Sequence, residues 1–539
     1  MPSVTHTAPA NLATHIEELF ATLDPQGPGA AVLVVHDSAV LYRRGFGLAN
    51  LELGVPMEPH MVLRIGSITK QFTAVAILML AQEGKLSLDD PITRFLPDYP
   101  TQGHVITVEH LLTHTSGIKS YTNMPEWLAL WRNDMSPPEI IALFKDQPLE
   151  FAPGQRWAYN NSAYILLGVI VEQASGTTYE AFLRERVFGP LGMTHSSSDH
   201  TERVVPGRVP GYQKGDHGYE NAPYLSMTQP YAAGALLSSV DDLALWDAAL
   251  YGETLLPRDA LQRAWTPAVL ADGTATGYGY GWELGAYEGH SVVEHGGGIP
   301  GFVAHALRLP DDRLFVAVLT NSAGGDLRPD RLAIKIAAAA LGSPYHEPTP
   351  VALDPAMLDR LVGVYAVDEK TEQVVTRSEG GLIFQRSGGA PEDLAALSPA
   401  EFYFTKDPFA RLSVSTDAAG AVTGLHVGSY SGPAEVATRT DRPLPQERQV
   451  IGLDPATYDR LVGVYQIAPG FVFTVSREGA GLFGQATGQQ KIEMFPQSAT
   501  LCLLKVVDAQ IEFVPDAAGM VTSLILHQGG QHLPAPRIS

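Results

Sequence analysis

The sequence predicts an α+β unit followed by two small antiparallel β-barrels. Strand-like runs stand at both ends of residues 1–345, and helix-like runs fill the middle of this stretch. In the C-terminal third, residues 353–365 recur as residues 453–465 with eleven of thirteen positions identical, which indicates a duplicated domain. The length of 539 residues also exceeds one compact domain, and about two to four domains are expected.

The first predicted unit combines strands from both ends of its sequence with an inserted helical region. Such an arrangement is typical of an α+β fold built on an antiparallel sheet. The predicted helices are Ala10–Leu23, Ser67–Gln82, Asn161–Gln173, Tyr179–Val187, Asp241–Leu250 and Leu332–Leu341. The predicted strands are Ala30–His36, Ala39–Tyr42, Tyr278–Leu284, Ser291–Glu294, Phe302–Leu309 and Phe315–Leu319.

The duplicated part contains short runs of Val, Leu, Phe and Thr separated by Gly, Asp or Pro turns. This spacing predicts small antiparallel barrels of lipocalin-like form. Pro-rich segments at residues 343–350 and 442–446 mark the joints. We therefore expect three domains, at residues 1–345, 346–447 and 448–539.

Composition argues against several classes of partner. Asp and Glu number 58 against 36 Lys and Arg, so the formal charge is −22 and no nucleic acid is expected. The apolar run Ala74–Ala81 is too short to span a membrane, and the first residues lack the pattern of a signal peptide. A cytoplasmic location without a membrane partner is the expectation. Cys502 is the single cysteine, which rules out an intramolecular disulfide.

Ser67 and Lys70 stand three residues apart where an apparent turn becomes an apolar helix. Residues at this spacing share one helical face, which brings a lysine next to the hydroxyl. A serine nucleophile needs a proton acceptor within reach, and a helix N-terminus favours the negative charge that develops there. The spacing by itself is weak evidence, because Ser116 and Lys119 repeat it in a predicted turn.

Tyr159 and Asn161 follow a Pro-Gly turn and precede a predicted helix. A phenol beside a lysine ammonium has a lowered pKa, so Tyr159 is a candidate base for Ser67. The Asn161 amide can accept a hydrogen bond from Lys70 and donate one to a substrate carbonyl. The alternative is structural, namely a buried tyrosine held by hydrogen bonds and an asparagine that caps the helix.

His295 precedes three glycines and follows the predicted strand Ser291–Glu294. Glycines let a substrate approach the backbone, whose N–H groups can bind an oxyanion, so Gly296 and Gly297 are candidate binding residues. The imidazole can titrate near neutrality and assist proton transfer or bind substrate. The alternative is a glycine-rich hairpin with a surface histidine.

His110 and His114 are four residues apart beside Glu109, as metal ligands can be. The order H-E-x-x-H is absent and no third ligand is apparent, so a structural role is favoured. We therefore expect neither a metal nor another cofactor.

Five motifs occur in order along the chain: Ser67-x-x-Lys70, Leu111-Leu-Thr-His-Thr-Ser-Gly117, Tyr159-x-Asn161, Ala233-Gly-Ala-Leu-Leu-Ser-Ser239 and His295-Gly-Gly297. Together they resemble the β-lactamase-related, or penicillin-recognising, serine hydrolases over nearly all of residues 10–340. The resemblance implies a β-lactamase/transpeptidase-like fold and an acyl-enzyme on Ser67. It also implies an oxyanion hole from the N–H groups of Ser67 and Gly298. Lys70 and Tyr159 would share the base role, and which of them is the base stays open.

Two features are similar to D-aminopeptidase in particular. One is histidine with two glycines in place of the Lys-Thr-Gly of most β-lactamases, and the other is a catalytic unit followed by two barrels. In that enzyme a loop of the last barrel helps to recognise the substrate amine. The corresponding residues 486–491 contain no carboxylate here, and the nearest is Glu493.

The set predicts a serine hydrolase that cleaves a small amide or short peptide, as a D-aminopeptidase-like peptidase does. A peptidase or amidase is favoured over an esterase. Alternatives are an esterase or β-lactamase-like hydrolase of loose specificity and, from another class, a non-catalytic binding or scaffold protein. A homodimer is compatible with the sequence.

Overall fold

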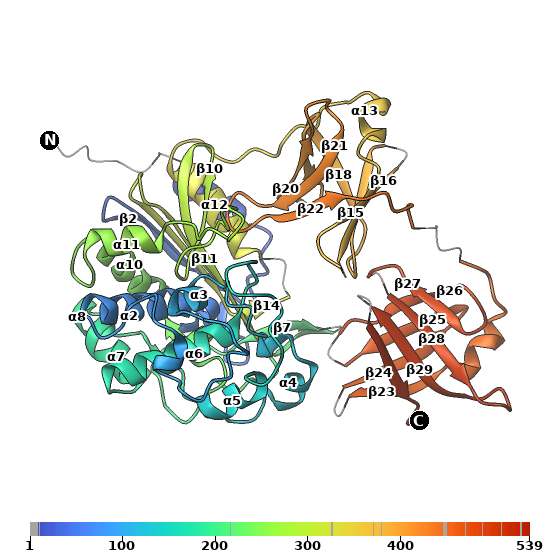
Figure 1. Cartoon of the computed structure of the whole chain (residues 1–539), viewed down its shortest axis with the longest axis horizontal. Helices are drawn as coiled ribbons and strands as arrows, with labels where there is room; N and C mark the ends of the chain where they lie inside the picture. The colour runs from blue at the N-terminus through green and yellow to red at the C-terminus, as the bar shows by residue number, and fades with distance from the viewer. Residues whose placement is uncertain are drawn as a thin grey trace. The chain divides into compact units, whose positions relative to one another are not determined.

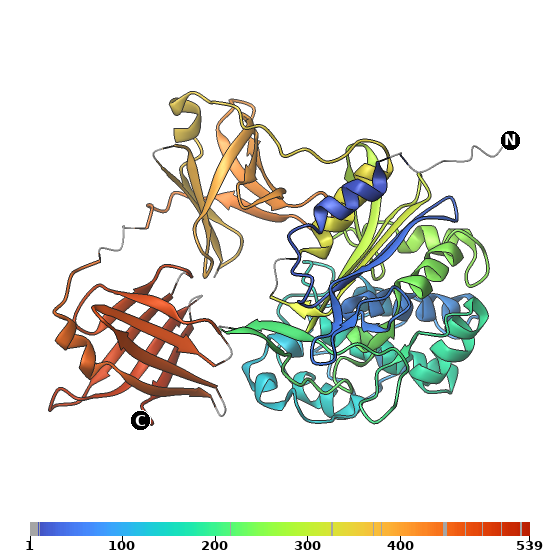
Figure 2. The same ribbon diagram turned by 180° about the vertical axis from the view of Figure 1, so that it is seen from behind.

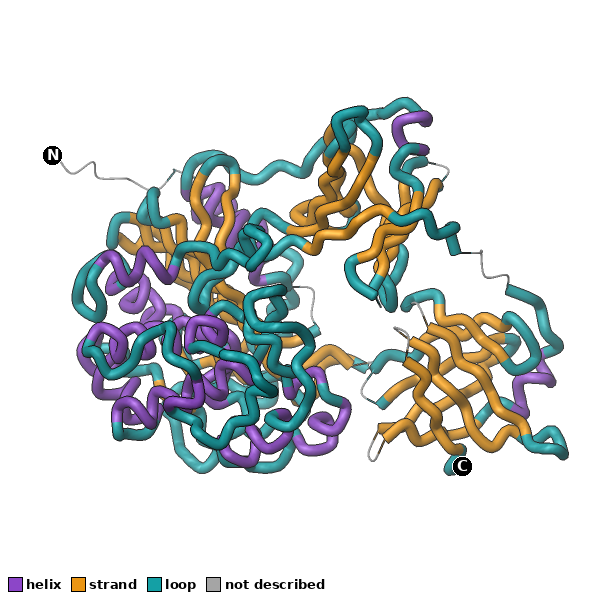
Figure 3. The backbone as a smooth tube through the Cα atoms, viewed as in Figure 1, coloured by secondary structure: helices purple, strands orange, loops and turns teal. Residues whose placement is uncertain are grey.

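The structure, a computed structural model, describes residue 9 and residues 11–539 except 216, 325–326, 370, 379, 446–449, 469–470, 488, 508 and 529–530. The predicted helix start at Ala10 and the predicted boundary at 447/448 lie outside the described residues. The chain divides into two compact units, of which the first ends at His346 and also includes Ser431–Pro433. Figure 3 shows that helices gather in the first unit, whereas the second consists mainly of strands.

A six-stranded sheet, in the order β10-β11-β12-β13-β1-β2, forms the centre of the first unit. The two ends of the sequence meet in it, because β1 (Ala30–His36) pairs antiparallel with β13 (Leu314–Thr320). Both strands are buried along their whole length, as expected for near-continuous apolar runs in the middle of a sheet. The predicted antiparallel α+β fold is therefore confirmed. The other four strands are β2 (Ala39–Phe46), β10 (Glu283–Tyr287), β11 (His290–Ile299) and β12 (Phe302–Leu309).

Helices pack on this sheet and also form a separate helical region (Figure 1). α12 (Pro329–Ala340) covers β12 and β13, with α1 (Leu12–Leu19) alongside it (Figure 2). α10 (Val240–Ala249) packs against β1 and β13. In the helical region α2 (Thr69–Gln82), α6 (Asn161–Ser175) and α9 (Tyr231–Gly234) contact one another. Shorter helices there and nearby are α3 (Val108–Leu112), α4 (Pro125–Leu130), α5 (Pro137–Phe144), α7 (Tyr179–Leu183), α8 (Gly189–Leu191) and α11 (Arg258–Ala264).

The remaining strands of the first unit are short. They form a pair, β3 (Leu48–Asn50) with β4 (Val55–Pro56), and two three-stranded sheets. One sheet contains β5 (Leu63–Arg64), β9 (Leu236–Ser238) and β6 (Ser197–Ser198), and the other contains β14 (Ser322–Ala323), β7 (Tyr212–Gly215) and β8 (Gly218–Asn221).

Three predicted elements differ from the structure. The helix expected from Ser67 begins as a 3₁₀ turn, Gly66–Ile68, and becomes α-helical at Thr69. The helix expected over Tyr179–Val187 changes at Leu183 into a π-helical turn, Arg184–Phe188. The strand expected over Tyr278–Leu284 is mostly loop, because Gly281 adopts a φ of +83° and β10 starts only at Glu283.

The second unit contains two eight-stranded antiparallel structures, which confirms the predicted pair of barrels. Strands β15–β22 form a closed barrel, and β23–β30 form a sheet whose ends meet through a bridge between Tyr465 and Arg537. The first set is β15 (Gly363–Ala366), β16 (Glu372–Arg377), β17 (Leu382–Arg386), β18 (Glu392–Ser398), β19 (Glu401–Phe404), β20 (Asp407–Thr416), β21 (Val422–Gly428) and β22 (Glu435–Arg439), preceded by α13 (Pro355–Asp359). The second set is β23 (Gly463–Ala468), β24 (Phe471–Glu478), β25 (Gly481–Ala486), β26 (Ile492–Pro496), β27 (Leu501–Leu504), β28 (Ala509–Pro515), β29 (Val521–Gln528) and β30 (Gln531–Pro536).

The repeated sequence motif makes the same contact in both copies. The Tyr365 hydroxyl donates to the Leu361 carbonyl at 2.6 Å, and the Tyr465 hydroxyl donates to the Leu461 carbonyl at 2.8 Å. Each buried phenol therefore ties the start of its first strand to the turn before it. Cys502 lies in the core of the second copy, where burial raises the pKa of its thiol to about 12.

Among the described residues, no helix combines the length and the apolar character that crossing a membrane requires.

Candidate active site

Ser67 and Lys70 lie where the 3₁₀ turn passes into α2. Gly66 adopts a φ of +51°, a backbone conformation that other residues rarely take, and so allows the sharp entry into the turn. Lys70 is fully buried, with its Nζ 3.1 Å from the Ser67 Oγ. The second match to this spacing is different, because Lys119 is ion-paired with Glu150 near the surface. The structure thus separates two identical sequence patterns by their surroundings.

The surroundings of the Lys70 amine suit a proton acceptor. Besides Ser67, its Nζ contacts the Asn161 Oδ1 at 2.8 Å and the Ala233 carbonyl oxygen at 2.9 Å. Both of these oxygens can only accept hydrogen bonds, whereas the Ser67 hydroxyl can also donate one. A neutral amine has two hydrogens for the two acceptors, and its lone pair then faces the Ser67 O–H. This arrangement lets Lys70 take the proton of Ser67.

Electrostatics favour the same protonation state. Burial lowers the pKa of Lys70 well below its ordinary value of 10.5. The rings of Tyr159 and Tyr164 lie 4.6 and 5.3 Å from its Nζ, and such faces attract a cation. Since no carboxylate bonds to Nζ in the described structure, loss of hydration outweighs this attraction and the neutral amine is favoured.

Two adjacent asparagines have different roles at the start of α6: one caps the helix and the other contacts Lys70. Asn160 caps the helix by accepting from the Ala163 N–H at 2.9 Å. The Asn161 side chain is therefore left for Lys70, and its Nδ2 donates to the Thr122 Oγ1 at 3.0 Å. In this orientation the amide oxygen faces Lys70 and the amide nitrogen faces Thr122. The structural alternative for Asn161 was a helix N-cap. In the structure, Asn160 makes this cap instead.

Tyr159 lies with its ring against Lys70, but its expected pKa shift was wrong in direction. Burial raises the pKa of Tyr159, the neighbouring Ser67 hydroxyl opposes that shift only in part, and Glu283 adds to it. The prediction assumed a nearby ammonium, whereas a neutral Lys70 supplies no positive charge. In the resting site, Tyr159 is therefore a protonated phenol that can donate a hydrogen bond.

His295 is buried, and its expected titration near neutrality was also wrong. Burial lowers the pKa of His295 to about 3. Its Nδ1–H donates to the Gly296 carbonyl at 2.6 Å, so the Nε2 accepts from the Tyr278 hydroxyl at 2.9 Å. With both nitrogens engaged, the neutral imidazole is held in one orientation. It packs against the Tyr159 ring at a centroid distance of 6.0 Å and so helps to hold that ring in place.

The glycines after His295 belong to a strand and not to a hairpin loop. β11 runs through them to Ile299, and Gly297 pairs with Ala304 of β12. A Cβ at Gly297 would lie 1.9 Å from the Ile65 carbonyl oxygen, so only glycine allows this strand to approach the turn of Ser67. A Cβ at Gly298 would meet nothing within 4 Å. The strand backbone is thereby brought beside the serine.

A small pocket of about 120 Å³ opens at Ser67. Gly298 and Asn161 line it together with Ser67, so the residues predicted to bind the oxyanion border the same space. Its remaining lining is mainly apolar and includes Tyr121, Trp127, Leu225, Pro230, Ile299 and Pro300. No Asp or Glu of the described chain lines it. The pocket therefore suits a small, uncharged acyl group.

Sequence reasoning missed three partners of this site. The Ala233 carbonyl was not foreseen because a backbone acceptor has no side-chain signature. Thr122 and Tyr278 were missed because their roles depend on contacts to Asn161 and His295 across distant segments. The nearest signal was the position of Ala233 at the head of an ordered motif.

Three other candidates lie apart from this cluster or serve the fold. The His110 Nδ1 accepts from the Thr107 N–H at the start of α3, and the His114 Nδ1 accepts from the Asn160 N–H. These bonds are structural, and the described residues contain no group of three or more His, Cys, Asp or Glu arranged for a metal. Glu493 is an exposed residue of β26, and its role in substrate recognition stays a prediction.

Known proteins that are similar to this chain show the family to which it belongs. The β-lactamase family profile matches residues 12–341, which is more than half of the chain. The chain belongs to the β-lactamase family. A second profile, a domain of unknown function called DUF3471, matches residues 447–535, the second of the two barrels. The resemblance and the β-lactamase/transpeptidase-like fold that the motifs predicted are thus confirmed.

Individual members of the family are only moderately similar. Penicillin-binding protein 4* of Bacillus subtilis is 29% identical over 73% of this chain and 92% of its own length. The D-aminopeptidase of Gluconobacter oxydans is 30% identical over 63% of this chain and 65% of its own. The solved D-stereospecific amidohydrolase from Streptomyces sp. is 28% identical, with a TM-score of 0.52 over 61% of this chain and 98% of its own. These comparisons support a serine hydrolase without fixing its substrate.

Proposed function

We propose that this protein forms an acyl-enzyme on Ser67 and hydrolyses a small amide or short peptide, with preference for a D-residue. The observation that carries the proposal is the position of the buried Lys70 amine, whose Nζ lies 3.1 Å from the Ser67 Oγ and also contacts two oxygens that can only accept hydrogen bonds. Lys70 takes the proton as Ser67 attacks the substrate carbonyl. The N–H groups of Ser67 and Gly298 then face the developing oxyanion.

The leaving amine must gain a proton when the tetrahedral intermediate collapses. Tyr159 is protonated at rest because burial raises its pKa, and it lies against both Lys70 and Ser67. It donates its proton to the leaving nitrogen and regains one from Lys70, which returns the site to its starting state. In deacylation, water attacks the acyl-enzyme in place of the amine, and the proton transfers through Tyr159 and Lys70 take place in the reverse order. Tyr159 and Lys70 thus share the work, with Lys70 as the first acceptor.

Support for an amide substrate comes from the relatives, since the Gluconobacter protein is named a D-aminopeptidase and the Streptomyces protein a D-stereospecific amidohydrolase. The small apolar pocket favours a short acyl side chain. Because no carboxylate lines that pocket in the described structure, hydrolysis of simple small-acyl esters is the second candidate.

Hydrolysis of D-Ala-, L-Ala- and Gly-p-nitroanilide beside p-nitrophenyl acetate and nitrocefin tests the proposal, with Ser67→Ala as the control. Cleavage of the D-Ala anilide that disappears in the variant is the expected result. Turnover of the acetate alone replaces the amide proposal by the esterase. Failure of a fluorophosphonate to label Ser67 removes both and leaves a binding protein on this fold.

A further inference from the structure

Trp127, a residue of the short helix α4, lines the pocket at Ser67. Leu225 and Pro230 line the same pocket. An acyl group bound to Ser67 must fit beside these three side chains. The pocket measures about 120 Å³, well below the range of about 300–1,000 Å³ that small-molecule sites occupy. The position of the indole, the largest of the three side chains, therefore limits the size of the acyl group.

α4 is weakly anchored by its own residues. All six residues of this helix, Pro125–Leu130, are described, and none of them is fully buried. A helix this short gains little stability from its own hydrogen bonds, and most helices in proteins are held by the packing of an apolar face. Contacts from another segment must therefore hold Trp127 at the pocket.

Gln229 supplies these contacts. It is fully buried, and its Oε1 accepts from the Trp127 Nε1–H at 2.7 Å. Its Nε2 donates to the carbonyls of Leu130 and Asn133 at 2.7 and 2.6 Å. An indole N–H can only donate and a carbonyl can only accept, so these partners determine the orientation of the amide. One side chain thus holds both the indole and the end of α4.

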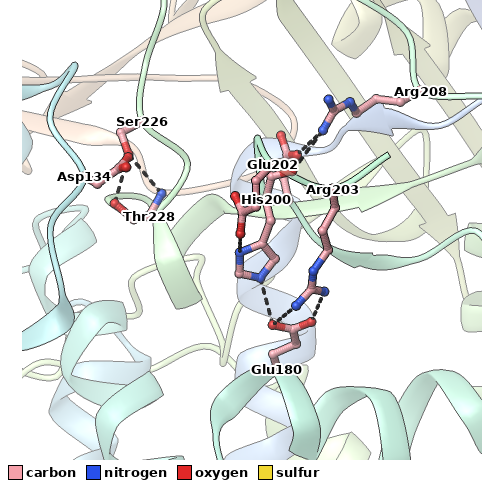
Figure 4. A network of polar contacts seen from close by, with 9 residues as sticks. Asp134, Glu180, His200, Glu202, Arg203, Arg208, Ser226 and Thr228 are labelled. Carbon is pink, nitrogen blue, oxygen red and sulfur yellow. Dashed lines mark hydrogen bonds and ion pairs between the residues drawn. The ribbon is translucent and has the colours of Figure 1, made fainter. Parts of the chain in front are cut away.

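The segment that carries Gln229 is itself held in place. The Gln229 carbonyl accepts from the hydroxyl of Tyr121, another residue that lines the pocket, at 3.0 Å. The Ser226 hydroxyl donates to the Asp134 carboxylate at 2.6 Å and lies 2.9 Å from the Thr228 hydroxyl, and Figure 4 shows both contacts. Because Asp134 follows α4 in the chain, these bonds keep Gln229 beside that helix.

We propose that Trp127 determines the acyl specificity of the Ser67 site and that Gln229 is the positioning residue that holds its indole. The indole restricts the acyl side chain to a short one, and its removal extends the pocket toward α4. This inference rests on the proposed acylation of Ser67 and adds which residues set the size of the substrate. Neither side chain takes part in the proton transfers.

The ratio of kcat/KM for p-nitrophenyl hexanoate to that for p-nitrophenyl acetate tests the proposal. The wild type should favour the acetate. Trp127→Ala should raise the ratio at least about tenfold, because one methylene in an apolar pocket changes kcat/KM by about 10–200-fold. Leu128→Ala is the matched control and should keep the wild-type ratio. Leu128 is the next residue of α4, but it is 51% exposed and is not among the described residues that line the pocket.

Gln229→Met tests the positioning role. Methionine has a similar volume but lacks the amide that contacts Trp127 and the end of α4. Loss of the hydrogen bond to the indole should raise the hexanoate-to-acetate ratio about threefold to tenfold. Trp127→Phe, which keeps an aromatic ring without the N–H, should change the ratio in the same direction. A merely structural role of Gln229 would lower both rates in proportion and leave the ratio unchanged, which would refute its assignment.

The outcomes separate this inference from the proposed function. A wild type that favours the hexanoate, an unchanged ratio in Trp127→Ala, or an equal rise in Leu128→Ala overturns the inference and leaves the acylation of Ser67 standing. A wild type that neither hydrolyses the acetate nor reacts with a fluorophosphonate at Ser67 removes the proposed function and this inference with it.

Discussion

Replacement of Lys70 by methionine tests the chemistry of the Ser67 site most directly. Methionine has a similar volume and no proton acceptor, so the buried position stays filled while the base is removed. A positioned base contributes about 10²–10⁴ in rate, and Lys70 also holds Asn161 in place. We expect acylation of Ser67 to slow by about 10⁴, which corresponds to about 5.4 kcal/mol of barrier.

The assay is the rate of Ser67 phosphonylation by a fluorophosphonate, followed by mass spectrometry from about pH 5 to about pH 11.5. Lys119→Met is the control, because Lys119 has the same sequence spacing but pairs with Glu150 at the surface. Its rate should match the wild type. Since burial lowers the pKa of Lys70, the wild-type rate should be maintained at neutral pH and fall as pH drops through that lowered value. Labelling of Lys70→Met within tenfold of wild type, or a wild-type rate that rises only near pH 10.5, would refute the reasoning.

Three further predictions concern the same unit. The folded pKa of Lys70 is below its unfolded value of 10.5, so the unfolded chain binds more protons between the two and stability rises with pH there. In urea unfolding, the wild type should therefore gain up to about 1.4 kcal/mol per pH unit relative to Lys70→Met in that window, and parallel pH curves would contradict this. Gly297→Ala should lower Ser67 labelling at least about 100-fold and lower the melting temperature, because its Cβ would lie 1.9 Å from the Ile65 carbonyl oxygen. Gly298→Ala should retain the wild-type melting temperature, because its Cβ would meet nothing within 4 Å. Equal melting temperatures for the two variants would contradict the close approach of the strand to the turn. Asp247→Asn should cost about 3–5 kcal/mol in denaturant unfolding, because it leaves the buried Arg308 without its carboxylate partner at 2.6 Å, and a loss below about 1 kcal/mol would show that solvent reaches this pair.

Much of the fold could be predicted from local patterns in the sequence. The strand Ala30–His36 was predicted with its exact bounds, because a fully buried central strand is a continuous apolar run. The duplication was also predictable, because residues 353–365 and 453–465 are nearly identical. In both copies the tyrosine of this motif bonds to a carbonyl of the preceding turn. The strand predicted over Tyr278–Leu284 failed, because the left-handed backbone at Gly281 interrupts it.

The candidate site was predictable in its residues but not in its charges. Spacing along one helical turn suggested the pair Ser67 and Lys70, and the order of the five motifs supported it and added Tyr159, Asn161 and His295. The sequence could not reveal how deeply these groups are buried. Because burial sets the pKa, the expected shifts of Tyr159 and His295 were wrong in direction or size.

By itself, the sequence determined which side chains this protein can use and the family to which it belongs, because both are written in local order and spacing. Only the tertiary structure decided how the surroundings of the two identical Ser-x-x-Lys patterns differ. At Lys70 the chain brings a carbonyl from α9 and an amide from α6 to the amine and removes its water, whereas Lys119 remains at the surface beside a carboxylate. The difference lies in the surroundings that distant segments supply, and no local pattern records them.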